Sequence, residues 1–153
     1  GRVMKQDPYS QRLEAFLHSD TISLGGFLAG DGRPLSEIIA GDLAVLDRLG
    51  YTAQEVASRM AAITELGLTG LGTTVVFEER LDVRVDDYQG RIICPFPHAA
   101  SCLKRMTHVS CQGGGKTVFW SDLNIHLIEA HGFFEGRGAY FRLEPADLVR
   151  ILF

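Results

Sequence analysis

The chain has 153 residues, of which 46% are hydrophobic and 22% are charged, and this composition is typical of a folded globular protein. No apolar run approaches the roughly 18 residues that a membrane-spanning helix needs, and the first thirty residues lack the pattern of a signal peptide, so we expect a cytoplasmic protein. The net charge is −4, with 8 basic and 14 acidic residues in 1–90 and 7 basic and 5 acidic residues in 91–153. Neither half has the basic excess that characterises a dominant nucleic-acid-binding protein.

Two amphipathic helices are predicted in the N-terminal half. Apolar residues recur at helical spacing over Leu35–Leu49, between a proline and a glycine. The sequence Thr52-Ala-Gln-Glu55 has the form of a capping box, which predicts that a second helix follows directly. Before these helices, a short amphipathic stretch at 11–18 and a glycine-rich segment at 24–30 are expected to form an arm or loop.

Short strands are predicted after Gly72, where β-branched residues become frequent and alternation appears. Tyr88-Gln89-Gly90 is predicted to be a turn, and so is the glycine-rich segment 112–115, so we expect two successive hairpins. The predicted strands are 74–77, 81–85, 91–94, 106–111 and 117–120.

The C-terminal half is expected to end with two helices. Ser121 or Asp122 can cap a helix that stops at the next glycine, and a short final helix is predicted at 145–152. The predicted fold class is therefore α+β. A helical N-terminal half, residues 1–72, is followed by β-hairpins and a helix in a zinc-finger-like C-terminal unit, residues 73–153, and we expect the two halves to form one compact unit.

The cysteines and histidines of the C-terminal half predict a metal site. Cys94, Cys102 and Cys111 lie within 18 residues, and an odd number of cysteines without a secretory signal argues against a disulfide framework. Zinc takes four tetrahedral ligands from Cys and His, and paired histidines are commonly separated by three to five residues. We therefore predict that Cys94, Cys102, His126 and His131 bind one Zn²⁺ ion.

The fourth ligand of this set is less defined than the other three. Seven residues separate Cys94 from Cys102, whereas the usual separation in such pairs is about two to four residues. His98 and Cys111 are therefore alternative ligands, and the fourth position is open among Cys102, Cys111 and His98.

The two histidines lie five residues apart on the predicted helix, which rotates them by about 140° relative to each other on an ideal helix. Both can then reach one ion only if the last turn unwinds before Gly132, and the alternative is that His126 and His131 are separate structural residues. The loop that follows, 132–142, is dense in aromatic residues, glycine and arginine. Its aromatic side chains are expected either to roof the zinc core or to contact a partner.

With Cys94 and Cys102 as the first pair and His126 and His131 as the second, this region resembles a Cys-Cys-His-His zinc finger. The resemblance covers about forty residues and implies a hairpin with sulfur ligands, followed by a helix that carries the two histidines. The segment Ser121–Gly136 is also similar to a segment of small uncharacterised bacterial cytosolic proteins. That second resemblance implies no known activity.

Two motifs related to nucleotide and DNA binding fail on their context. Gly113–Thr117 ends like a phosphate-binding loop, but the first glycine of that motif falls at Ser110, and a strand follows instead of a helix. The segment Gly50–Met60 looks like the first helix of a helix-turn-helix, but no recognition helix follows it.

These observations favour a zinc-stabilised binding or regulatory module over an enzyme, with another protein or a second copy of the chain as its partner. One alternative is a small zinc-dependent, hydrolase-like enzyme in which Glu129 lies beside an open coordination position. A further alternative is weak nucleic-acid binding through Arg91, Lys104, Arg105 and Lys116.

Overall fold

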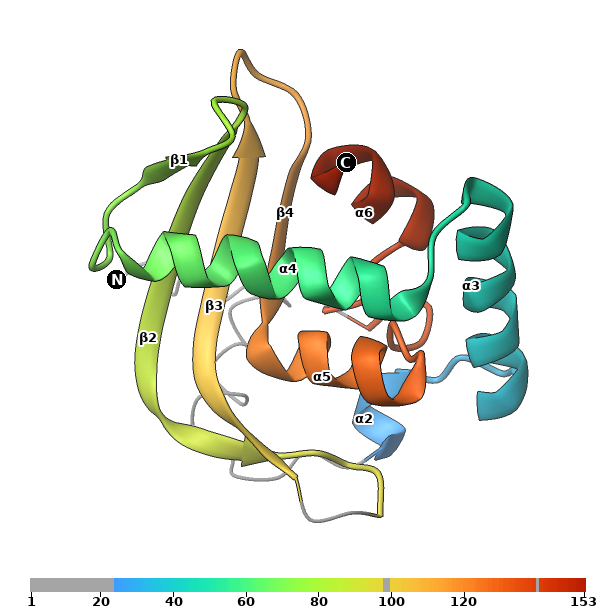
Figure 1. Cartoon of the computed structure of the whole chain (residues 1–153). Coiled ribbons are helices and arrows are strands. Elements are labelled where there is room, and N and C mark those ends of the chain that lie inside the picture. The colour runs from blue at the N-terminus through green and yellow to red at the C-terminus, as the bar shows by residue number, and fades with distance from the viewer. Residues whose placement is uncertain (1–23, 98–99, 140) are drawn as a thin grey trace, which may run out of the picture.

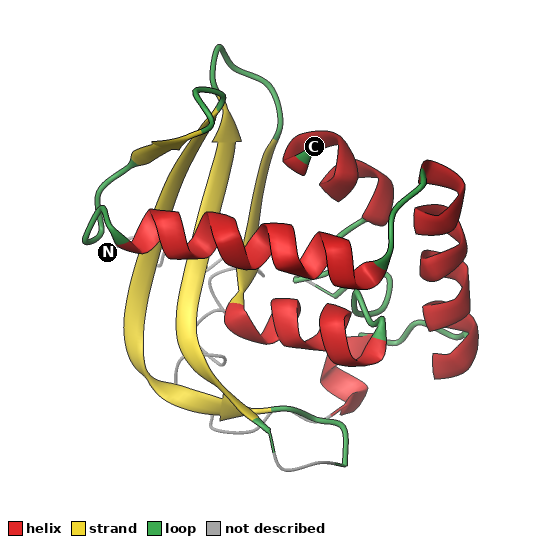
Figure 2. Cartoon of the chain, viewed as in Figure 1, coloured by secondary structure: helices red, strands yellow, loops and turns green. Residues whose placement is uncertain are grey.

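The structure, a computed structural model, describes residues 24–97, 100–139 and 141–153. Helices pack on an antiparallel sheet of four strands (Figures 1 and 2), which confirms the predicted α+β class. None of the described helices has the length and apolar character that a bilayer span requires. In chain order the elements are α2 (Leu24–Leu28), α3 (Leu35–Leu49), α4 (Ala53–Leu68), β1 (Val75–Phe77), β2 (Leu81–Ile93), β3 (Ser101–Cys111), β4 (Thr117–Ser121), α5 (Asp122–His131) and α6 (Pro145–Leu152).

The helices α3 and α4 begin and end as their sequences predict. α3 ends at Gly50, which takes the left-handed conformation. The predicted capping box at the start of α4 is confirmed, because the Glu55 N–H donates to Thr52 Oγ1 at 3.1 Å and the Thr52 N–H donates to Glu55 Oε1 at 3.2 Å. The Gln11–His18 stretch lies outside the described residues.

Gly67 lies inside α4, where it allows the helix to approach the sheet closely. A Cβ atom at this position would lie 2.6 Å from Val85 Cγ2 and 2.8 Å from Val83 Cγ1. Only glycine fits this contact, so Gly67 allows α4 to lie close against β2, in addition to being near the end of the helix.

The sheet has the strand order β1-β2-β3-β4, in which each strand pairs with the next one along the chain. The predicted turn at Tyr88-Gln89-Gly90 is wrong, because these residues lie within the single long strand β2. Between Asp87 and Arg91 the register of β2 against β3 shifts, and Gln89 and Gly90 have positive φ values of 56° and 95°. The residues that suggest a turn instead form a β-bulge, since β3 pairs with β2 on both sides of it.

The predicted turn between β3 and β4 is confirmed, and β3 extends five residues further toward its N-terminus than predicted, to Ser101. Figure 1 shows β2 and β3 curving together beneath α5 toward the loop that joins them. This curvature brings the end of β2 close to α5.

Buried apolar side chains form two clusters. The first lies between α4, α6 and the sheet, and it includes residues from both predicted halves, so these halves share a core. Inside it, Trp120 Nε1–H donates to Thr64 Oγ1 at 2.9 Å, and the Thr64 and Thr107 hydroxyls lie 2.7 Å apart. The second cluster connects α2, α3, α5 and the β2–β3 hairpin, and it consists of Phe27, Ile38, Ile92, Cys94, Met106, Leu123, Leu127 and Phe133.

Candidate metal centre

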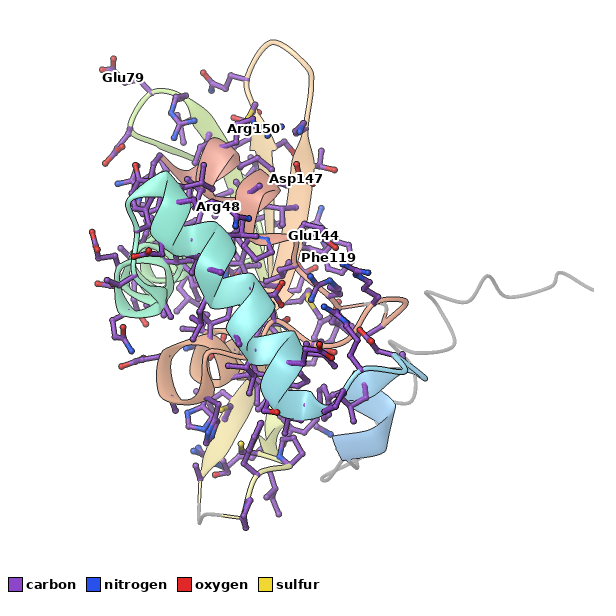
Figure 3. The ribbon with its side chains drawn as sticks, turned by 90° about the vertical axis from the view of Figure 1, so that its right-hand side faces the viewer. Arg48, Glu79, Phe119, Glu144, Asp147 and Arg150 are labelled. Carbon is purple, nitrogen blue, oxygen red and sulfur yellow. The ribbon has the colours of Figure 1, made fainter. Side chains whose placement is uncertain are left out.

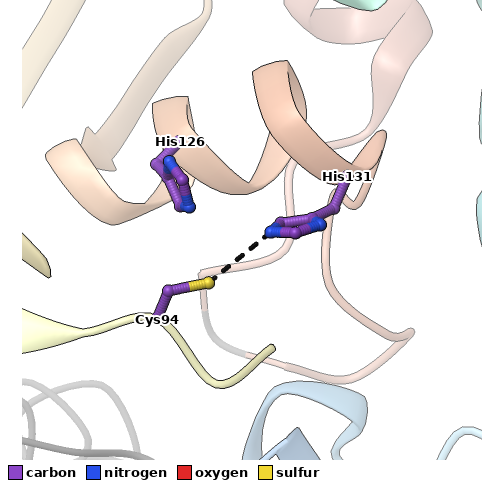
Figure 4. Close-up of side chains that lie close together, drawn as sticks. All are labelled: Cys94, His126 and His131. Carbon is purple, nitrogen blue, oxygen red and sulfur yellow. Dashed lines mark hydrogen bonds between the residues drawn. The ribbon is translucent and has the colours of Figure 1, made fainter. Parts of the chain in front are cut away.

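Three predicted ligands come together at the point where the β2–β3 hairpin reaches α5. Cys94 directly follows β2, and its N–H donates to the Ala100 carbonyl oxygen at 3.0 Å, which continues the strand pairing. His126 and His131 lie on α5, and Figure 4 shows both imidazole rings pointing toward Cys94. Their ligand atoms and the Cys94 Sγ all lie within 4.8 Å of one another.

The helix reaches this geometry without the predicted unwinding. α5 is helical through His131, and Gly132 ends it in the left-handed conformation, with the Gly132 and Phe133 N–H groups bonded to the carbonyls of Ile128 and Leu127. The two rings are 5.5 Å apart, centroid to centroid, at an interplanar angle of 82°. His131 is the last helical residue, and its ring lies at the end of α5, directed toward Cys94 (Figure 4).

The distance between Cys94 and His131 suits a tetrahedral zinc ion. Zinc lies about 2.3 Å from sulfur and about 2.0–2.1 Å from imidazole nitrogen, so a tetrahedral site places sulfur and nitrogen ligands about 3.6 Å apart. The Cys94 Sγ and His131 Nε2 are 3.7 Å apart. The pair is therefore spaced as two corners of a tetrahedral site.

Apolar and aromatic side chains enclose the centre. Cys94 is 3% exposed, and burial raises the pKa of its thiol, while a backbone hydrogen bond from Phe96 opposes the shift. The Phe96 ring stacks on His131 at 3.9 Å and 9°, and Phe133 meets Phe96 edge-on. A thiol in such surroundings needs a nearby cation to favour its charged form, and a metal ion would supply one.

Cys102, a predicted ligand, is not among the three residues whose ligand atoms come together, so its role as a ligand stays a prediction. It pairs with Ile92 on β2, and it is half-buried beside α5. Burial, the negative charge of Asp122 and the proximity of Cys94 raise the Cys102 pKa to about 11. The strand register therefore places this thiol next to the centre.

The two alternative fourth ligands have different outcomes. Cys111 lies at the opposite end of β3, where it pairs with Leu81 and packs against the first apolar cluster, so its prediction as an alternative ligand is wrong. His98 lies outside the described residues.

Glu129, the predicted carboxylate beside the metal, is exposed and is not part of the three-residue group. It lines two grooves that flank α5. One groove, with a volume of about 470 Å³, also has His131 in its wall, and the other, with a volume of about 260 Å³, has His126. The backbone oxygen of Glu129 accepts a hydrogen bond from Gln54 at 3.4 Å.

The four basic residues considered for nucleic-acid binding do not form one basic surface. Arg105 pairs with Asp122 at 2.7 Å, and Lys116 pairs with an aspartate of α6 at 3.1 Å. Lys104 is 4% exposed, and Arg91 donates to a serine hydroxyl at 2.8 Å. Because successive side chains of a strand point to opposite faces of the sheet, Lys104 and Arg105 place their positive charges on different faces.

A third groove lies between β4 and α6, with a volume of about 380 Å³. Figure 3 labels three of its lining residues, Phe119, Glu144 and Asp147. Neither Cys nor His is among its described lining residues. The Cys/His cluster at α5 is therefore the stronger candidate for chemistry.

A buried polar network, which the sequence did not predict, fixes the loop after α5. Arg142 forms a bidentate ion pair with Asp42 of α3, with both N–O distances 2.9 Å and both side chains 7% exposed. Asn124 Nδ2 donates to Glu135 Oε2 at 2.8 Å. Phe133, one of the aromatic residues expected to roof the centre, belongs to the apolar cluster that contains Cys94.

The rest of this loop divides between the two apolar clusters. Phe141 packs against the cluster that contains Cys94, whereas Phe134 belongs to the first cluster. Gly136 lies so close to α2 that an added Cβ would clash with the Leu28 carbonyl oxygen. The described part of the loop is thus packed against the body of the protein.

Comparison of the chain with protein-family models, with curated proteins and with solved structures finds no match.

Proposed function

We propose that the protein binds one Zn²⁺ ion through Cys94, His126 and His131, and that the ion stabilises a cytoplasmic binding or regulatory module. The observation that carries this proposal is the convergence of the three ligand atoms within 4.8 Å. Another protein or a second copy of the chain would be the partner of such a module.

The donor set favours zinc among the common metal ions. One thiolate with two imidazoles is a combination that zinc accepts readily, whereas calcium and magnesium prefer oxygen ligands. The Sγ–Nε2 distance of 3.7 Å also suits a tetrahedral ion.

We further propose His98 as the fourth ligand. Three residues separate it from Cys94, within the two to four residues that are usual in the first pair of a zinc site. With this ligand the site has a closed coordination sphere, which is the arrangement of structural zinc ions. This assignment rests on the sequence spacing alone.

A structural ion at this position would connect two segments that are far apart along the chain. Cys94 ends β2, and His126 and His131 belong to α5. Because the metal binds only when these segments are together, its binding free energy adds to the stability of the folded state.

A small hydrolase-like metalloenzyme is the second candidate. Three protein ligands leave one position for water, and the two grooves beside His126 and His131 offer access to Glu129. In this alternative His98 does not bind the ion.

Elemental analysis of the purified protein tests the metal, and Co²⁺ substitution tests the coordination. We expect about one zinc per chain and a visible Co²⁺ spectrum with the strong bands of a tetrahedral ion. The variant His98→Ala should shift these bands and change their intensity, because water would replace the imidazole, whereas His108→Ala, on β3 and outside the group, should leave the spectrum unchanged. Absence of bound metal from the folded, reduced protein would contradict the proposal, and an unchanged spectrum in His98→Ala would favour the enzyme.

A further inference from the structure

Two cysteines share one face of the β2–β3 hairpin. Ile92 pairs with Cys102, and Cys94 lies two residues beyond Ile92 along the same strand direction. The exposure of the side chains alternates along this segment, since Ile92 and Cys94 are buried whereas Ile93 is exposed. Cys94 and Cys102 are therefore diagonal neighbours on adjacent strands.

The same two residues meet at the candidate metal centre. Cys94 belongs to the three-residue group, and Cys102 lines the groove that also has His126 in its wall. Cys102 packs against the apolar cluster that contains Cys94. One thiol thus lies inside the coordination group, and a second lies directly beside it.

We propose that Cys94 and Cys102 form a redox switch, in which a two-electron oxidant such as hydrogen peroxide converts them to a disulfide and releases the metal. This inference rests on the proposed function of the site. Peroxide oxidises the sulfur of Cys94 to a sulfenic acid and is reduced to water. The Cys102 thiol then attacks that sulfur, a second water leaves, and the S–S bond forms.

The hairpin needs only a small movement to form this bond. Diagonal neighbours have Cα atoms about 7–8 Å apart, whereas a disulfide requires about 4.4–6.8 Å. The two Cα atoms must therefore approach by at most roughly 4 Å at this end of the hairpin. When Cys94 no longer binds the ion, its side chain is released from the two imidazoles and can turn toward Cys102.

Cys111 provides a matched control on the same strand. It lies nine residues from Cys102 at the other end of β3, which is about 30 Å away in an extended strand. It can reach neither thiol, so its replacement should leave the switch intact.

The test treats the reduced, zinc-loaded full chain with hydrogen peroxide and follows zinc release with a chromogenic indicator. The unchanged protein and Cys111→Ser should release about one zinc per chain, lose about 2 Da in mass and yield a peptide linked between Cys94 and Cys102. Dithiothreitol with added zinc should restore the bound metal. Cys102→Ser should bind zinc equally well before oxidation, but excess peroxide should oxidise its Cys94 through the sulfenic acid to the sulfinic acid, which dithiothreitol does not reduce, so its zinc should not return.

Several outcomes would overturn the switch. These are a linked peptide with another pairing, a reversible zinc release in Cys102→Ser, or the failure of reduced Cys102→Ser to bind zinc, since that failure would make Cys102 a ligand. Failure of the proposed function is a separate result, because the zinc content of the reduced protein is measured before any oxidant is added. If that content is zero, peptide mapping still decides whether the two thiols pair.

Discussion

Replacing His126 by alanine should lower the stability of the zinc-loaded protein and leave that of the metal-free protein nearly unchanged. His126 is half-buried, and its ring nitrogen belongs to the three-residue group with Cys94 and His131. Truncating a partly exposed imidazole removes little apolar packing. Most of the effect should therefore arise through the metal.

The magnitude follows from the linkage between metal binding and folding. An ion that binds only the folded state contributes about 2.7 kcal/mol when its free concentration is 100-fold above Kd, and about 4.1 kcal/mol at 1,000-fold. In a protein of about this length, each kcal/mol corresponds to roughly 2–4 °C in Tm. If the variant no longer binds the ion, Tm should fall by about 5–16 °C.

Differential scanning calorimetry with buffered free zinc, repeated with a chelator, measures this effect. His108→Ala is the matched control, because His108 lies on β3 outside the group, where its Nε2 is 3.5 Å from Asp86 Oδ2. Its Tm should respond to zinc in the same way as that of the unchanged protein. An equal loss of Tm in His126→Ala with and without chelator would refute the reasoning, since His126 would then contribute through packing alone.

Three further predictions concern the fold. Thr64→Val should lower the free energy of unfolding in urea by about 1–3 kcal/mol, because the buried Trp120 Nε1–H loses its acceptor. Gly136→Ala should lower Tm strongly, because its Cβ would clash with a carbonyl oxygen of α2, whereas Gly32→Ala, which has open space, should not. Burial lowers the pKa of His108 from its ordinary 6.5. As pH falls below 6.5, His108 therefore binds a proton more readily in the unfolded chain than in the folded one, and the free energy of unfolding decreases. In chelator, urea unfolding at about pH 7.5 and pH 5.5 should show a smaller decrease for His108→Gln.

The helices could be predicted because their signals are local. The capping box at Thr52 and the glycine after α3 lie next to the helices that they delimit. The bulge in β2 could not be distinguished from a turn, because Gln89 and Gly90 favour positive φ in either structure. Only the pairing with β3, in which Asp87 pairs with Arg105 and Arg91 pairs with Leu103, determines that the strand continues.

The site shows the same division between local and distant information. Cys94 at the end of a predicted strand and the closely spaced His126 and His131 on a predicted helix could be recognised from the sequence, and these three residues converge in the structure. The position of Cys102 beside the three-residue group depends on the register of β2 against β3, which composition and spacing do not specify. The Asp42–Arg142 pair joins residues 100 positions apart, so no local pattern indicates it.

The position of the proposed ion has a physical reason in the packing of the hairpin. Beyond the bulge, the face that carries Ile92 and Cys94 is buried, whereas Ile93 and Leu103 on the opposite face are 45% and 40% exposed. Apolar burial therefore holds this end of the hairpin on one side only. A bond from Cys94 through an ion to α5 would add a constraint that depends on the metal. The same location makes the end of the hairpin, and not the core around Trp120, the part that loss of the ion would release.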